Sequence, residues 1–252
     1  MSDEKSDEKR AEKANDTPAR GGQDMPEVEI DVILDFSCPW SYIGKKRLDA
    51  TLDILGQEGF KVNWYPYMLA ADIPPGGIPR KEWLARTYGN AEQQAKALEP
   101  IKVAGLQEGI EFNFDAIEVM PNTLDAHRIM RWAREAGKGS EMADRLFELF
   151  FIEGEDIGDM DVLARAAAQV GIMDAFRAQK MLESGTDAEE VWQEIMEVRK
   201  LGVKRIPAFI IARRYAVLGA EDPVTLAKTL QAVQAELELE REEGKAQASK
   251  ES

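Results

Sequence analysis

The chain has 252 residues, of which 44% are hydrophobic, enough to fill a core of ordinary size. Acidic residues outnumber basic ones by 47 to 32, so the surface repels polyanions and a nucleic acid is excluded as an expected partner. No segment approaches the ~18 apolar residues of a membrane span. A secretory signal would need an apolar core of ~7 to 15 residues near the N-terminus, and the sequence has none there. We therefore expect a cytoplasmic protein without a membrane partner.

The two ends of the chain have compositions that disfavour a packed core. Residues 1–25 mix both charge signs with almost no large apolar side chain, so burial cannot offset the entropy lost on ordering. We predict a disordered charged tail there. Residues 241–252 are also polar, and we predict a polar C-terminal tail.

The first structured segment predicts a β-α-β unit. Residues 29–35 combine β-branched side chains with alternation, which indicates a strand, and residues 36–39 turn the chain. Pro39 suits a first helical turn, and apolar residues recur at helical spacing until Gly56. Residues 60–67 indicate a second strand that ends irregularly at a proline.

Helical periodicity dominates the middle of the chain, from about residue 79 to residue 201, with loops near Pro121, Gly137, Gly158 and Gly185. Two short strands then follow, at about 207–212 and 215–218. A final helix is expected over about 222–239, with Asp222 as its N-cap and a proline in its first turn.

The order of elements predicts an α/β protein with a thioredoxin fold, β-α-β and then β-β-α, divided by a helical insertion. We place the thioredoxin-fold domain in residues 26–75 and 202–240. The inserted helical domain occupies residues 76–201.

Cys38 is the only cysteine, so no disulfide forms within one chain and any thiol chemistry involves a second molecule. It stands between a strand and the start of a helix, where the helix dipole and unpaired N–H groups favour a thiolate. In such settings a thiol pKa falls from about 8.5 into a range of roughly 3.5 to 7.5, which predicts a nucleophile. A buried structural cysteine explains the tetrad Cys38-Pro39-Trp40-Ser41 equally well.

Pro207 stands at the start of the third strand, where a proline inside the sheet would remove a ladder hydrogen bond. A cis Ile206–Pro207 bond would expose the backbone of Ile206 to a partner beside the sulfur. A proline that merely ends a loop is the simpler alternative.

Five segments in the same order resemble the FrnE-like branch of the DsbA family. They are DFSCPWSYIGKKRL, PNTLDAHR at 121–128, FFIEGEDIGDMDVL at 150–163, GVKRIPAFII at 202–211 and YAVLGAEDP at 215–223. The resemblance implies a disulfide oxidoreductase with Cys38 as nucleophile, Pro207 as cis-proline, and Pro39, Trp40 and Ile206 beside the substrate.

The sequence departs from that branch at Ser41, which replaces the second cysteine of its C-P-W-C motif and cannot resolve a mixed disulfide. Ser41 could donate a hydrogen bond to the thiolate of Cys38, or merely satisfy the backbone of the first helical turn.

The tetrad also resembles the motif S-P-x-S-W of kappa-class glutathione transferases and 2-hydroxychromene-2-carboxylate isomerases, in which Cys38 falls on the serine that activates glutathione. That resemblance implies that Gly219, Ala220 and Glu221 lie near the γ-glutamyl end of glutathione, although the charge of Glu221 opposes a carboxylate.

His127 is the only histidine, and a lone helical histidine is more often structural than catalytic, so we carry it only as a candidate ligand-binding residue. With one histidine and one cysteine, no metal site is expected. No tightly bound cofactor is expected either, with glutathione as a possible co-substrate.

Three functions remain. The first is a monothiol thiol-disulfide oxidoreductase that acts on a disulfide-containing or glutathionylated protein. The second is a glutathione-dependent isomerase or transferase with a small-molecule substrate, and the third is a non-catalytic binding protein. The resemblance also allows a homodimer.

Overall fold

A computed structural model describes residues 26–250 and contains a four-stranded sheet of order β2-β1-β5-β6. The strands are β1 (Val28–Leu34), β2 (Phe60–Pro66), β5 (Ala208–Ile211) and β6 (Tyr215–Leu218). β1 runs parallel to β2 and antiparallel to β5, and β6 returns antiparallel to β5. This is the predicted thioredoxin topology. The tail predicted for residues 1–25 lies outside the described residues.

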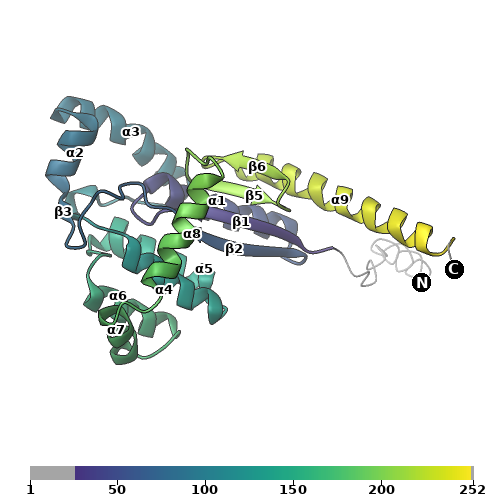
Figure 1. Cartoon of the computed structure of the whole chain (residues 1–252). Helices are drawn as coiled ribbons and strands as arrows, with labels where there is room; N and C mark the ends of the chain where they lie inside the picture. The colour runs from purple at the N-terminus through teal and green to yellow at the C-terminus, as the bar shows by residue number, and fades with distance from the viewer. Residues whose placement is uncertain (1–25, 251–252) are drawn as a thin grey trace, which may run out of the picture.

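The sheet carries helices on both faces, because the side chains of β1 alternate and are nearly all buried. α1 (Pro39–Leu55) and α9 (Pro223–Ala248) pack together on the face to which Ile30 and Val32 point. α8 (Ala188–Lys200) crosses the opposite face near the ends of the strands (Figure 1), where Val198 packs against Ile33. Cys38 therefore stands at one end of a two-sided sheet.

The chain between β2 and α8 is helical, as predicted. Its elements are β3 (Ile78–Pro79), α2 (Arg80–Tyr88), α3 (Ala91–Gln107), the 3-10 turn η1 (Phe114–Ala116), β4 (Val119–Met120), α4 (Leu124–Glu135), α5 (Gly139–Glu148), the π-helical turn η2 (Leu149–Glu153), α6 (Met160–Val170) and α7 (Ala175–Glu183). An aromatic cluster joins this insertion to α1, since the Tyr42 ring stacks on that of Phe147 at 4.9 Å.

Two features differ from the sequence prediction. β3 and β4 form a two-residue antiparallel pair that is too short to leave a pattern in the sequence. The final helix, predicted to end at about residue 239, continues to Ala248, so most of the predicted polar segment from residue 241 is helical, and α9 projects beyond the sheet (Figure 1). Its last turns are rich in Glu, Lys, Ala and Gln, which favour helix without needing a buried face.

The rest of the C-terminal prediction is confirmed. Asp222 caps α9, and its Oδ1 accepts from the backbone N–H groups of Val224 and Thr225. Over residues 26–250 no helix is both long and apolar enough to cross a membrane.

Candidate active site

Cys38 is the N-cap of α1, as the sequence predicts. Its backbone is extended, with φ −96° and ψ 114°, and Pro39 occupies the first helical turn. The Cys38 N–H donates to the carbonyl of Asp35 at 3.0 Å, and the Cys38 carbonyl accepts from the N–H of Ser41 at 3.0 Å. These bonds fix the turn that carries the chain from β1 into the helix.

The thiol of Cys38 is buried, with 5% of the residue exposed, and this reverses the expected effect of the helix terminus. The pKa of Cys38 is raised to about 11, chiefly by burial, since a thiolate loses its hydration there, and to a smaller extent by the charge of Asp35. Ser41 and the backbone N–H of Trp40 lower the pKa, but by less. The predicted low pKa is therefore wrong for this conformation, and Cys38 is a neutral thiol at pH 7.

Ser41 is fully buried, and its Oγ has no partner in hydrogen-bond geometry among residues 26–250. The hydroxyl nevertheless lies near enough to Cys38 to lower the pKa of the thiol. A buried hydroxyl without a full hydrogen bond costs free energy. The Ser41 hydroxyl is therefore placed to stabilise a charge at Cys38, and it makes no hydrogen bond to the backbone of the first turn.

Asp35 and His127 lie beneath the Cys38 turn, and both are nearly inaccessible to solvent. The Asp35 carboxylate accepts from the backbone N–H of Ser37 at 3.1 Å and from that of Leu69 at 2.6 Å. His127 Nε2 lies 3.0 Å from the carbonyl of Tyr67, to which it donates, and 4.0 Å from Asp35 Oδ1. Burial lowers the pKa of His127. His127 is thus a buried residue held by the Tyr67 carbonyl beneath the Cys38 turn.

Asp35 was not predicted as a site residue, although its position just before the turn was a signal. The sequence pattern also gives no indication of Tyr88, the last residue of α2. Burial first, and then the neighbouring Cys38, raise the pKa of Tyr88. Tyr88 is thus near enough to Cys38 for an electrostatic interaction, and nothing in its surrounding sequence connects it to a residue fifty positions away.

Pro207 packs against the helix that carries Cys38. The Ile206–Pro207 peptide bond is cis, as the resemblance implies. A Cβ added at Gly44 would overlap the Pro207 ring and lie 3.3 Å from its Cβ, so only glycine admits this contact. The Pro207 carbonyl accepts from the Gly219 N–H at 2.7 Å. Pro207 thereby links α1 to Gly219, the residue that follows β6.

Residues 219–221 lie beside this proline but have their polar groups engaged. The Ala220 carbonyl accepts from Arg47 Nη1 at 2.7 Å, and the Glu221 N–H donates to the carbonyl of Gly219. Asp222 already occupies the first N–H groups of α9. A γ-glutamyl carboxylate would have to displace Asp222 to bind there.

Apolar side chains surround the turn at the surface. Trp40 and Leu69 are 36% and 46% exposed, and Ile206 and Pro39 are partly exposed. In the described part of the chain, no group of three or more His, Cys, Asp or Glu residues is arranged to hold a metal ion.

Comparison with known proteins identifies the family. The profile of the DSBA-like thioredoxin domain matches residues 29–231. The chain therefore belongs to the DSBA-like thioredoxin domain family, and its class is that of DsbA-like thioredoxin-fold oxidoreductases. A curated relative, the uncharacterized protein YwbO of Bacillus subtilis, is 29% identical over 73% of this chain and 86% of its own.

Solved structures share the fold. A probable DsbA oxidoreductase from Streptomyces coelicolor has a TM-score of 0.76 at 24% identity, covering 83% of this chain and 91% of its own. A 2-hydroxychromene-2-carboxylate isomerase gives 0.63 at 14% identity, covering 84% and 98%. The cytosolic disulfide reductase DsbM from Pseudomonas aeruginosa, solved with GSH, gives 0.55 at 17% identity, covering 85% and 99%.

Proposed function

We propose that the protein is a monothiol, glutathione-linked oxidoreductase that removes glutathione from glutathionylated proteins. The observation that carries the proposal is the tetrad Cys38-Pro39-Trp40-Ser41 at the start of α1, beside a cis-proline, in a chain with no second cysteine. With serine in the fourth position, a mixed disulfide at Cys38 persists until an external thiol attacks it.

The reaction balances with glutathione as the reductant. The Cys38 thiolate attacks the glutathione sulfur of the substrate, a disulfide forms between Cys38 and glutathione, and the protein thiolate leaves and takes a proton. The thiolate of a second glutathione then attacks the glutathione sulfur of that disulfide, which releases oxidised glutathione and regenerates Cys38. Two glutathione sulfurs are thereby joined, and the substrate sulfur is reduced.

The high pKa of Cys38 means that the closed conformation is a resting form. Ionisation requires solvent or substrate to reach the sulfur, and the residues that bury Cys38 have to move for that contact. Once the thiolate forms, the N–H groups of the first turn and the Ser41 hydroxyl stabilise it. We place this activity in the cytoplasm, where reduced glutathione is maintained, and the cytosolic DsbM, solved with GSH, supports that setting.

The test is deglutathionylation of a glutathionylated protein under excess glutathione, with intact mass recorded in parallel. Wild type should pass through a species heavier by one glutathione, whereas Cys38→Ser should show neither the adduct nor turnover. In Ser41→Cys the new thiol should displace glutathione from Cys38 within the protein, which should change the kinetic order of the reaction in glutathione. Full activity in Cys38→Ser would overturn the proposal.

The buried neutral thiol favours a second candidate, a glutathione-dependent isomerase or transferase. In that reaction Cys38 stays protonated and donates a hydrogen bond to the thiolate of bound glutathione, and a pKa of about 11 suits that role. The fold is shared with a 2-hydroxychromene-2-carboxylate isomerase. Cys38→Ser separates the two candidates, because a serine donor would retain isomerase activity and abolish disulfide exchange. A non-catalytic binding protein is indicated if neither activity is found.

A further inference from the structure

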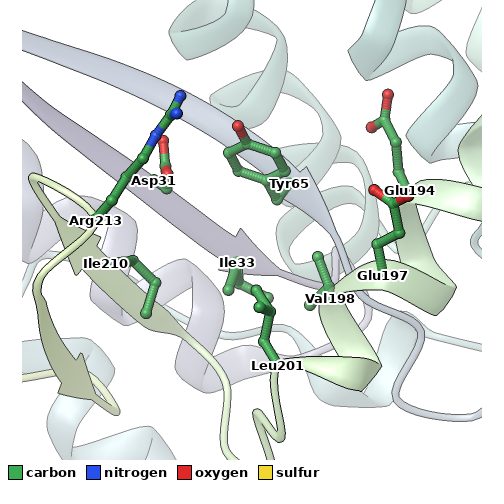
Figure 2. A pocket seen from close by; sticks show the side chains of 9 residues that line it. All are labelled: Asp31, Ile33, Tyr65, Glu194, Glu197, Val198, Leu201, Ile210 and Arg213. Carbon is green, nitrogen blue, oxygen red and sulfur yellow. The ribbon is translucent and has the colours of Figure 1, made fainter.

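A pocket with a cavity volume of about 360 Å³ lies on the sheet face opposite α1, under the C-terminal half of α8. The strand register explains its floor, because Ile33 pairs with Tyr65 across β1 and β2, and Asp31 pairs with Ile210 across β1 and β5. These side chains therefore share one face (Figure 2). The volume is at the small end of the range for small-molecule sites.

The floor of this pocket is apolar and incompletely covered. Ile33, Ile210 and Val198 form it, and Leu201 stands at its edge just beyond the last turn of α8 (Figure 2). Leu201 is 71% exposed, which leaves a large apolar side chain in water beside an apolar cavity. A ligand with an apolar body would remove both surfaces from water.

The charges around the floor are unbalanced toward the negative. Asp31 is 9% exposed, and its carboxylate accepts one hydrogen bond in the described chain, from the Asn63 amide to Oδ1 at 2.9 Å. The Arg213 guanidinium, which lies at the same end of the pocket in Figure 2, pairs with Glu29 at 3.3 Å. Asp31 therefore makes no ion pair within residues 26–250, and the Arg213 guanidinium that lies near it in Figure 2 is engaged by Glu29.

The other acidic groups strengthen this imbalance. Glu194 is neutralised by Arg131 and Arg134, whereas Glu197 is exposed at the rim and has no ion pair within residues 26–250. Tyr65 places its phenol in the same space. The chain as a whole carries a net charge of −15, which adds a long-range attraction for cations.

We propose that this pocket binds a small organic cation with an apolar body, of the arylalkylammonium class. Its ammonium group pairs with Asp31 and receives further attraction from Glu197, and its apolar body lies on Ile33, Ile210 and Leu201. An anion is disfavoured because the basic groups at the pocket already pair with glutamates. The site is separate from Cys38 and does not depend on the proposed oxidoreductase activity.

The test uses phenethylammonium as the probe, with the full chain labelled for ¹H–¹⁵N NMR titration. We expect saturable shifts at β1, β5 and the end of α8, with 2-phenylethanol and 3-phenylpropionate at least tenfold weaker. Asp31→Asn should weaken phenethylammonium at least tenfold, because it removes a charge-assisted contact. Leu201→Ser, at an exposed position that does not threaten folding, should weaken all three compounds.

The matched control is Glu190→Gln, which removes one negative charge from α8 outside the pocket and should leave binding unchanged. Equal binding of the three compounds, shifts confined to the Cys38 turn, or pocket shifts that follow protein concentration and not the probe would overturn the proposal. The last result would assign the face to a second copy of the chain. Cys38→Ser should bind the probe as wild type does, so the result of this test is independent of the redox proposal.

Discussion

The high pKa of Cys38 predicts slow alkylation at neutral pH. A shift from an ordinary value of about 8.5 to about 11 leaves roughly 300-fold less thiolate at pH 7 than in a free cysteine. A more basic thiolate is a better nucleophile. With a Brønsted coefficient of ~0.4 to 0.5, each Cys38 thiolate should react roughly tenfold faster, or slightly more, than the thiolate of a free cysteine. Iodoacetamide should therefore modify Cys38 roughly 20- to 30-fold more slowly than it modifies free cysteine.

Intact mass spectrometry suits this measurement because Cys38 is the only cysteine. The logarithm of the rate should rise with unit slope from pH 7 and continue without a plateau toward pH 11, while circular dichroism confirms that the protein stays folded. Ser41→Ala should slow alkylation further, since the hydroxyl lowers the pKa of Cys38. Ser140→Ala, at an exposed position in the first turn of α5, is the control. A plateau below pH 8 would refute the burial argument.

Three further predictions concern stability. Gly44→Ala should destabilise the protein by ~1 to 3 kcal/mol in urea unfolding, because the methyl group of the new alanine overlaps the ring of Pro207. The control Gly244→Ala, at a helical position with open space around it, should stabilise the protein by up to ~1 kcal/mol. Lys45→Ala should cost ~1.5 to 3 kcal/mol, because it removes a buried ammonium and its charged hydrogen bonds to Asp49 and Asp144, while Asp144 keeps its ion pair with Lys46. Lys61→Ala, at a half-exposed position, should cost less than ~1 kcal/mol, and equal losses in the two variants would contradict the argument. Because the pKa of Cys38 is raised in the folded state, Cys38 ionises at lower pH in the unfolded state. The free energy of unfolding should therefore fall by up to ~3 kcal/mol as pH rises from about 8.5 to 11. Cys38→Ala should remove that part of the pH dependence, and an identical pH dependence in both proteins would count against the prediction.

The sequence predicts the fold because its local signals agree with its long-range order. Alternation in β1, the proline at the start of α1, and Asp222 before α9 each indicate an element that the structure contains. The helical insertion is also predicted, since its amphipathic segments are long and end at glycines. The extended end of α9 is missed because composition indicates polarity, and polarity does not decide between helix and coil.

The site is only partly predictable, and the reason is burial. Sequence places Cys38 at a helix N-terminus, which alone would favour a thiolate, but it cannot say how much protein covers the sulfur. The charge of Asp35 raises the pKa of Cys38, and desolvation by the surrounding protein outweighs the helix terminus. The identity of the nucleophile can thus be predicted from local pattern, whereas its ionisation depends on tertiary contacts.

The pairing of β1 with β5 also has a consequence for how the chain folds. Ile30 lies beside Ile211, so the central ladder of the sheet closes a loop that contains the whole helical insertion. Closing so long a loop carries a large entropic cost when the intervening chain is unstructured, and non-local pairing of this kind slows folding. The insertion is helical and rich in local contacts, so its prior formation would shorten the effective loop. We therefore expect the helices between β3 and α8 to gain hydrogen-exchange protection before the central strands do.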